Sequence, residues 1–504
     1  MGEAQEWLFE PDFNRAVKVR TTDERITSDA GLLLLREADH RLGLTEHLAS
    51  QLVDPRRPER IRYELVELLR ERVYGLALGY AAQDDADRLA HDPAMKLAAW
   101  NRPGDQTLEE RLASQPTQSR LLNILTQHAP NRAALRDALA ECCARHLRAT
   151  GGAGTPKGSA ARRITLDVDS FPIQVHGRQP GAAYNGHYGE TVYHPLVASY
   201  SVAGHYDSMQ QGHRLGNGFV HAILRQGQVH TAQGVLRFLQ ETLRLAEPLG
   251  YLIDLRIDAG YVFGEVLDWL TERKLRFLGR IKTNAVLDRL AAPHLTRPVG
   301  RPPQEGYEKI IELGSYQAES WRHPQRLVLV VVDRPDPKTG QLNLLPNYFF
   351  LIVGWKPEEL SGEEALAHYR QRGTFEDRLG EFQQAIGPHL SHADFRENET
   401  VLRLALLAFN LVSALRIEYE DAAGSCFDLG RFQRDVLKAG ARVAKHSQRL
   451  VVYVAQVVRP FWEKLVARLR RWRLPPGWGQ PRGPRVRQWR PPPRHAFTSE
   501  VRRL

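Results

Sequence analysis

The sequence predicts a multidomain α/β protein in which a mixed β-sheet follows an all-helical N-terminal domain. The chain has 504 residues, more than one hydrophobic core usually organises, so about two to four structural units are expected. Over the first 150 residues, apolar side chains recur at three- and four-residue intervals, which is typical of helices. Beyond residue 162 they form short runs that first follow one another and then alternate with helical segments, which predicts a mixed sheet.

Residues 1–148 are predicted to form the helical domain. Its predicted helices span residues 31–42, 61–78, 94–99, 108–113, 119–126 and 133–147. Residues 107–120 also fit a helix-turn-helix, with a break at Pro116 and with Thr117 or Ser119 capping the second helix. An ordinary helical corner explains this segment equally well, because the turn lacks a diagnostic glycine. DNA binding by this domain is expected because of other features of the chain and not because of this segment alone.

Residues 149–162 are rich in turn-forming residues and are predicted to be a flexible linker. Strands are predicted at residues 163–169, 194–202, 219–224, 252–257 and 277–281, and helices at 232–245 and 264–273. Three sequential strands that lead into alternation with helices describe an antiparallel meander joined to a parallel half. This is the strand order expected of an RNase H-like fold, and residues 163–284 are its predicted first part.

A β-rich insertion is predicted to interrupt this domain at residues 285–356. After a proline-rich stretch it contains strand-like runs at residues 309–313, 327–332 and 348–353, with a turn at 336–340 between the last two. Helices predicted at residues 362–386 and 399–419 then complete the domain, whose second part spans residues 357–420. Residues 421–504 are interpreted as a helical C-terminal region with a basic tail.

The charge of the chain favours a polyanionic partner. Lys and Arg number 69 against 59 for Asp and Glu, so the formal charge is +10, which suits nucleic acid or an acidic membrane surface. No basic and then apolar leader opens the chain, and the most apolar window, residues 404–415, is shorter than the roughly 20 residues a bilayer needs and contains Asn410. The three cysteines lack zinc or disulfide spacing. A cytoplasmic protein with no membrane association is expected.

The excess of positive charge lies at the C-terminal end. Between residues 468 and 504 there are eleven arginines, opposed only by Glu500. Trp472, Trp478 and Trp489 are interleaved with them, so the segment could lie on phosphates while the indoles stack. A disordered basic extension is the preferred interpretation over specific docking.

Three carboxylates occupy positions that the predicted fold would bring together. Asp169 ends the first strand and shares a strand face with Asp167, its rival for the same role. Asp258 ends the fourth strand, where Gly260 permits a sharp turn. In an RNase H-like sheet these two strands are neighbours, so the two carboxylates would converge.

The third carboxylate, Glu376, is predicted on the helix after the insertion. Tyr369, Arg372 and Glu376 follow a spacing of i, i+3 and i+7, which puts them on one helical face. Three carboxylates without histidine or cysteine suit magnesium, and two hard ions about 3.5–4 Å apart could neutralise charge in phosphodiester chemistry. Taken singly, an Asp at a strand end is more often a solvated edge residue or a cap, and a Glu on a polar helix more often faces water.

Several segments resemble a known family. They are 166–170 (Leu-Asp-Val-Asp-Ser), 175–177 (Val-His-Gly), 183–188 (Ala-Tyr-Asn-Gly-His-Tyr), 193–197 (Tyr-His-Pro-Leu-Val), 256–261 (Arg-Ile-Asp-Ala-Gly-Tyr) and 369–376 (Tyr-Arg-Gln-Arg-Gly-Thr-Phe-Glu). Together they make the chain similar, from near Phe9 to about Tyr419, to bacterial insertion-sequence transposases with a group 1 DDE domain. The resemblance is to the branch marked by a Tyr, Arg, Glu, Lys helix signature.

The resemblance implies that Asp169, Asp258 and Glu376 form a metal-binding catalytic triad and that Tyr369 and Arg372 grip the DNA backbone. It implies two Mg²⁺ ions, with Mn²⁺ as a substitute, and cut-and-paste transfer, in which DNA is nicked at the element's ends and the freed 3′ hydroxyl attacks the target. The implied partners are double-stranded DNA with terminal inverted repeats and a second copy of the chain in the DNA complex. The implied location is the bacterial cytoplasm, on the nucleoid.

The chain departs from the family pattern in two places. Gln383 stands where the signature lysine is expected, so either Arg378 substitutes from a neighbouring turn or strand positioning is weakened. Residues 199–228 look longer than, or altered from, the usual second hairpin. Two alternatives therefore stay open: a transposase-derived DNA-binding protein that no longer cuts, and an RNase H-like nuclease without strand transfer.

Overall fold

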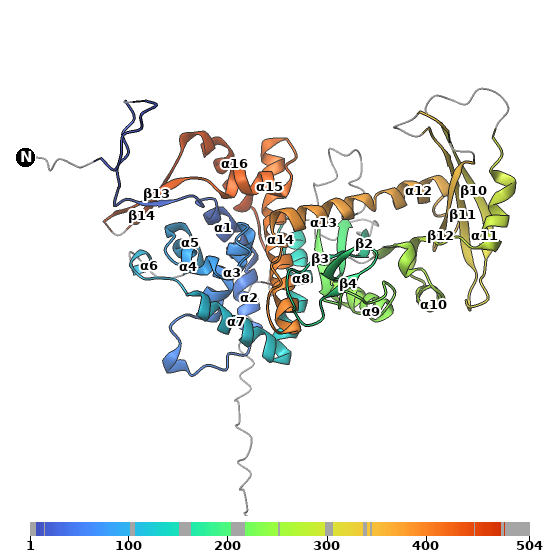
Figure 1. Cartoon of the computed structure of the whole chain (residues 1–504), viewed down its shortest axis with the longest axis horizontal. Helices are drawn as coiled ribbons and strands as arrows, with labels where there is room; N and C mark the ends of the chain where they lie inside the picture. The colour runs from blue at the N-terminus through green and yellow to red at the C-terminus, as the bar shows by residue number, and fades with distance from the viewer. Residues whose placement is uncertain are drawn as a thin grey trace, which may run out of the picture.

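The fold has a helical body and an extended sheet, which meet along one long helix. The computed structural model describes residues 7–14, 16–100, 106–150, 163–202, 217–249, 252–297, 306–335, 340–342, 345–447, 449–474 and 478. The N-terminal helices lie at one end of the molecule and the last strands of the sheet at the other (Figure 1). Most of the predicted turn at 336–340, most of the predicted linker, part of the hairpin at 199–228 and most of the basic tail lie outside the described residues.

Helices dominate the chain between residues 32 and 149, as predicted. They are α1 (Leu32–Leu42), α2 (Leu44–Gln51), α3 (Leu65–Ala77), α4 (Asp85–Leu89), α5 (Pro93–Ala99), α6 (Gln106–Glu109), α7 (Gln115–Gln127) and α8 (Ala129–Ala149). The helix predicted at residues 108–113 is wrong beyond Glu109. Leu112 and Ala113 are buried in a loop, where their amides donate to the Ala90 carbonyl and the Glu71 carboxylate. Their apolar character reflects this burial and not a helical face.

Of the two interpretations of residues 107–120, the helix-turn-helix does not describe the structure. The break falls at residues 110–114, and α7 begins at Gln115 with Ser114 as its N-cap. Pro116 lies inside the first turn of α7, where its missing amide breaks no intrahelical bond. Because α6 has only four residues, it cannot serve as the first helix of such a motif. The apolar residues of α7 instead pack into the helical core.

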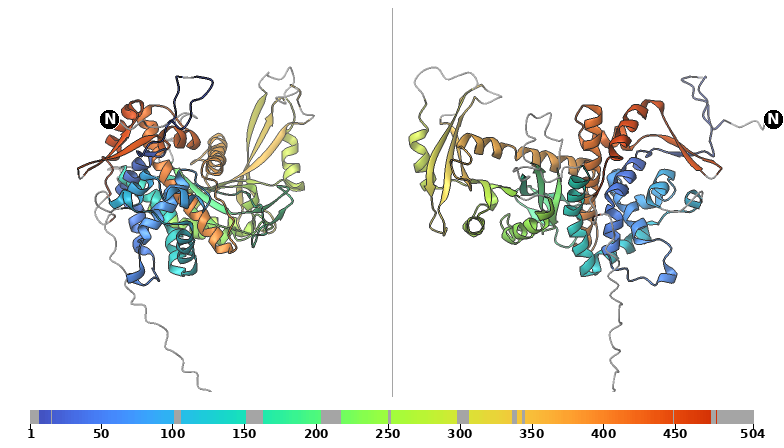
Figure 2. Two further views of the ribbon diagram at one scale, coloured as in Figure 1. Left: turned by 60° about the vertical axis from the view of Figure 1, so that its left-hand side comes forward. Right: turned by 180° about the vertical axis from the view of Figure 1, so that it is seen from behind.

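A single long helix, α14 (Phe395–Ala423), runs through the centre of the molecule. By length and composition α14 could cross a membrane, yet its apolar window is entirely buried in the protein. It packs against α3 and α8 on one side and against the sheet on the other, which the rear view in Figure 2 shows as an orange helix between the two parts. The prediction that this segment forms core is therefore confirmed.

The main sheet has the predicted strand order around the first strand. Its first five strands are β2 (Arg163–Ser170), β6 (Leu196–Val202), β7 (Asn217–Ile223), β8 (Leu252–Ile257) and β9 (Arg276–Ile281). Strand β2 pairs antiparallel with β6 and parallel with β8, while β7 pairs with the far side of β6 and β9 with the far side of β8. Helices α9 (Val235–Ala246) and α10 (Gly264–Glu272) supply the crossovers. The first and fourth predicted strands are thus neighbours.

Three further strands lengthen this sheet. They are β10 (Tyr307–Tyr316), β11 (Gln325–Asp333) and β12 (Asn347–Val353), preceded by α11 (Ala285–Ala291). Strand β12 pairs antiparallel with β9, so the strands predicted after residue 285 belong to an eight-stranded sheet. The pairing covers the edge that β9 would otherwise expose.

Two small sheets were not predicted. One contains β3 (Ile173–Gln174), β4 (Ala183–Asn185) and β5 (Glu190–Tyr193), and the other contains β1 (Arg25–Thr27), β13 (Ala441–His446) and β14 (Arg449–Val454). The C-terminal region is therefore not wholly helical, although α15 (Leu429–Phe432) and α16 (Arg459–Leu469) belong to it. Strand β1 is too short to show alternation in sequence, and it depends on β13, a distant partner along the chain.

Candidate active site

The predicted helix at residues 362–386 is two helices joined end to end. Helix α12 (Gly362–Arg370) and helix α13 (Gly373–Ala385) meet at Gln371 and Arg372 and cross the sheet together (Figure 1). At the junction the amide of Arg372 donates to the Tyr369 carbonyl, and the amide of Phe375 donates to the Arg372 carbonyl, each at 2.9 Å. These i to i−3 bonds tighten the chain between the two helices. They place the side chain of Arg372 at the junction.

The three predicted carboxylates converge on the guanidinium of Arg372. Its Nη2 contacts Asp169 at the end of β2 and lies 3.7 Å from Asp258 Oδ1 after β8. Its Nη1 donates to Glu376 Oε1 on α13 at 2.7 Å. Residues far apart in sequence therefore surround one positive charge, and that charge belongs to an arginine.

Asp169 is the most enclosed of the three. One of its oxygens accepts from the backbone amide of Ser170 at 2.7 Å and from the Tyr261 hydroxyl at 3.3 Å. Burial raises the pKa of Asp169 to about 6, although the charge of Arg372 and the Ser170 amide oppose the shift. The charges of Asp258 and Glu376 add to the rise.

Asp258 is held at a sharp turn. It caps the short 3-10 turn η3 (Ala259–Tyr261) by accepting from the Gly260 amide at 3.3 Å. A Cβ at Gly260 would lie 3.0 Å from Thr231, so glycine lets the turn lie against the loop before α9. The buried Tyr261 then reaches back to β2, where its hydroxyl donates to Ser170 Oγ at 2.9 Å. The turn thus links the ends of the two strands.

Asp167, the rival of Asp169, has another partner. It is buried against Arg256 of β8, which donates to both of its carboxylate oxygens at 2.7 Å. Arg256 therefore neutralises the Asp167 carboxylate within the core, away from the Arg372 guanidinium that Asp169 contacts. Arg256 also donates to the His368 carbonyl at 2.9 Å and to Gln371 Oε1 at 3.3 Å. Through Arg256, Asp167 is therefore connected to the junction between α12 and α13.

The other signature residues divide between the site and the core. Tyr369 is partly buried in the last turn of α12, three residues before Arg372; burial raises its pKa, and the charge of Arg372 opposes the rise. Arg378 points elsewhere: it is buried and donates to Ser199 Oγ at 2.5 Å on β6. The expected substitution of Arg378 for the signature lysine is therefore not supported by its position. Gln383 is exposed and donates to the Pro172 carbonyl at 3.0 Å.

Sequence reasoning missed one cation near the site. Arg225 follows β7 and is buried, where it donates to the His194 carbonyl at 3.0 Å and to the Thr231 carbonyl at 2.9 Å. Burial lowers the pKa of Arg225, while the nearby Tyr261, Tyr188 and Asp169 act to raise it. The signal available in the sequence was a single arginine that directly follows an apolar strand.

The donor atoms of Asp169, Asp258 and Glu376 are carboxylate oxygens, the kind of ligand that a hard divalent cation binds. Within the described ranges, no group of three or more His, Cys, Asp or Glu side chains is arranged to hold a metal ion. The three carboxylates instead share the Arg372 guanidinium as their cation. Oxygen donors of this kind are those that magnesium prefers.

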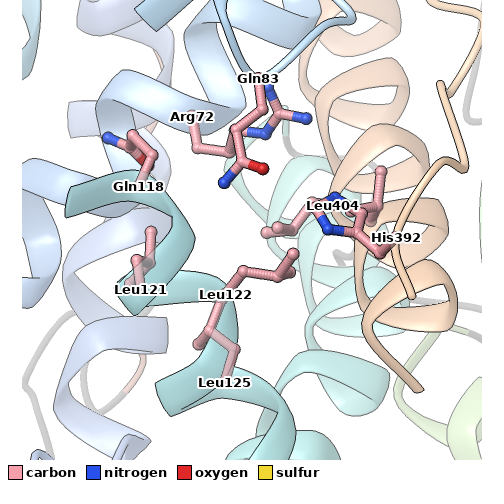
Figure 3. Close-up of a pocket in the computed structure, with 9 residues that line it drawn as sticks. Arg72, Gln83, Gln118, Leu121, Leu122, Leu125, His392 and Leu404 are labelled. Atoms are coloured by element: carbon pink, nitrogen blue, oxygen red, sulfur yellow. The ribbon is translucent and has the colours of Figure 1, made fainter. Parts of the chain in front are cut away.

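Two cavities among the described residues lie away from the acidic cluster around Arg372. The one in Figure 3 has a volume of about 10 Å³ and lies among α3, α7 and α14, with Arg72, Gln118 and His392 in its wall. It has room for about one water molecule and none for a substrate. The other is an open depression of about 570 Å³ at the start of α9, lined by His230, Gln233 and Arg237 among others.

The fold and this cluster define a mixed α/β protein with an acidic site where two neighbouring parallel strands end beneath a helix junction. The chain belongs to the transposase family described as "Transposase DDE domain group 1", which matches residues 9–474. No curated protein matches it. A solved structure that it resembles is the cryo-EM structure of the piggyBac transposase synaptic complex with hairpin DNA. That chain is 13% identical, with 82% of each chain covered and a TM-score of 0.41.

Proposed function

We propose that this transposase cleaves DNA at the ends of an insertion sequence and joins the freed ends to a target by cut-and-paste transfer. Family membership supports transposition in general. The observation that carries the finer proposal is the meeting of Asp169, Asp258 and Glu376 around one cation. These three residues are the proposed catalytic carboxylates.

The proposed chemistry depends on carboxylates that hold Mg²⁺, for which Mn²⁺ would substitute. When bound, two such ions would neutralise charge on the attacking and leaving oxygens of the phosphodiester. Asp169, Asp258 and Glu376 would hold them, and Tyr369 and Arg372 would orient the DNA backbone. Arg372 is suited to this because a guanidinium binds two phosphate oxygens side by side.

The proposed domain organisation follows the sequence boundaries. An RNase H-like core would comprise residues 163–284 and 357–420, and its support is the order of β7, β6, β2, β8 and β9 in the sheet. Residues 285–356 would be an insertion that extends this sheet. Residues 1–148 would bind DNA, with a linker at 149–162 and a basic tail within 421–504.

The proposed partner is double-stranded DNA that carries the terminal inverted repeats of the element. The net charge of +10 supports a polyanionic ligand. A homodimer in the DNA complex would hold the two ends, and the site of action would be the cytoplasm, on the nucleoid.

Cleavage of a duplex that contains the element's own ends tests the proposal. Asp169→Asn, Asp258→Asn and Glu376→Gln should each reduce Mg²⁺-dependent nicking by about a hundredfold or more, because each removes a charged metal ligand. DNA binding should survive in all three. Asp377→Asn is the matched control, since Asp377 is an exposed neighbour of Glu376 on α13. Full nicking in the three variants would refute the proposal.

Gln383 favours one alternative, a DNA-binding protein that no longer cuts. If the wild-type chain binds the ends but nicks nothing in Mg²⁺ or Mn²⁺, this alternative is selected. Gln383→Lys restores the signature charge on an exposed side chain, so a gain of nicking in this variant would locate the defect in strand positioning. A nuclease without strand transfer would instead yield nicked DNA and no joined product.

A further inference from the structure

The guanidinium of Arg372 occupies the centre of the acidic cluster. Its side chain is 12% exposed, and its two amino groups contact Asp169 and Glu376, with Asp258 at 3.7 Å. One positive charge therefore faces three carboxylates.

Arg372 differs from the other arginines near the site in what holds it. Arg225 donates to backbone carbonyls, and Arg256 donates to a backbone carbonyl as well as to Asp167 and Gln371, which anchors both in the fold. The side-chain bonds of Arg372 run to carboxylates of the cluster. It also lies between the end of α12 and the start of α13, so neither helix continues through it. Its position therefore depends on the acids remaining available to it.

A divalent ion and this guanidinium would need the same carboxylate oxygens. An ion that takes them removes the partners of Arg372, which then needs another anion. A DNA phosphate offers two oxygens in the geometry that a guanidinium prefers. Because binding couplings are reciprocal, DNA that accepts Arg372 would raise the affinity of the acids for metal, and metal would raise the affinity for DNA.

We propose that Arg372 is the resident counter-ion of the three carboxylates, that it competes with divalent metal for them, and that a DNA phosphate relieves this competition. The inference rests on the proposed function, because it assumes that these acids bind metal. It assigns to Arg372 a role before DNA arrives, in addition to its expected grip on the backbone. The metal site would then be complete only when DNA is bound.

Binding of Mn²⁺ to the full-length protein, followed by electron paramagnetic resonance, tests the competition. Without DNA, Arg372→Gln should bind Mn²⁺ about tenfold more tightly than wild type. Arg370→Gln is the matched control and should behave as wild type, because Arg370 pairs with Glu308 of β10 instead of with the three acids. Arg372→Lys should fall between them, since an ammonium cannot contact two acids through a planar fork.

The coupling is tested by repeating the titration with a duplex of arbitrary sequence. The same duplex with the Asp169→Asn, Asp258→Asn double variant measures Mn²⁺ held by the DNA itself. Wild type should gain about tenfold in Mn²⁺ affinity from the duplex, whereas Arg372→Gln should gain little. Thermal unfolding supplies a second readout: Arg372→Gln should be less stable than wild type without metal and should recover with Mn²⁺.

The outcomes separate the two proposals. Equal Mn²⁺ affinity in wild type and Arg372→Gln, unchanged by the duplex, would overturn the counter-ion role and leave the triad as a metal site. Binding that never exceeds the double-variant background, in any protein with or without the duplex, would overturn the proposed function and the inference with it.

Discussion

Arg256 and Asp167 form a buried, doubly hydrogen-bonded ion pair between two neighbouring parallel strands. The two residues are direct partners in the register of β8 and β2, and both bonds are 2.7 Å long. The remaining amino group of Arg256 reaches the end of α12 and Gln371. The pair therefore connects the sheet to the junction that carries Arg372.

The first prediction concerns this pair. Asp167→Asn leaves the charge of Arg256 buried without its partner, so the free energy of unfolding should fall by about 3–5 kcal/mol. Urea denaturation measures the change. The double variant Asp167→Leu, Arg256→Met removes both charges and should recover much of the loss. An Asp167→Asn protein as stable as wild type would show that the pair does not stabilise the fold.

The second prediction concerns Asn410, a polar residue in the most apolar stretch of the chain. It accepts from the amide of Phe219 and donates to the same residue's carbonyl, both at 2.8 Å, and so covers the edge strand β7. Asn410→Leu should lower the free energy of unfolding by about 2–4 kcal/mol, because the Phe219 amide loses its side-chain partner and the Phe219 carbonyl keeps only the weak bond from Cys143 Sγ at 3.7 Å.

Ser413 provides the control for Asn410. It is buried on the same helix, and its hydroxyl has no hydrogen-bond partner among the described groups. Ser413→Ala should therefore be neutral or slightly stabilising in the same urea titration. Equal losses in the two variants would mean that the bonds to Phe219 contribute nothing beyond side-chain packing.

The third prediction concerns pH. Burial raises the pKa of Glu71 on α3 to about 8. The unfolded chain releases this proton near pH 4.5 and the folded chain holds it, so the free energy of unfolding should fall as pH rises from about 4.5 to about 8. Glu71→Gln mimics the protonated acid and should remove a few kcal/mol of this dependence. Denaturation at about pH 5 and about pH 9 would reveal it, and parallel pH profiles of the two proteins would contradict it.

The fourth prediction concerns the basic tail. Deletion of residues 479–504 removes seven arginines and one glutamate. If these arginines contact phosphates, the slope of log affinity against log salt concentration should shrink by up to about six for duplex DNA. Fluorescence anisotropy at several salt concentrations measures the slope. An unchanged slope would mean that the tail makes no phosphate contacts.

Local patterns were sufficient for much of the fold. The long runs of β2, β8 and β11 and the apolar face of α14 are signals carried by consecutive residues, and the structure has these elements within a few positions of the predictions. Very short strands such as β1 carry no such signal. The break between α12 and α13 was also missed, because residues 371 and 372 keep helical backbone angles and leave the apolar period almost unchanged.

By itself, the sequence indicated that three acids lie on elements that an RNase H-like strand order would bring together, because local periodicity locates the strands and the helix that carry them. Only the tertiary structure decided which neighbours those acids have. It paired Asp167 with Arg256, turned Arg378 into the core and placed Arg372 among Asp169, Asp258 and Glu376. The physical reason is that a charged side chain takes its partner from whatever the fold brings within a few ångströms, and sequence distance does not report that proximity.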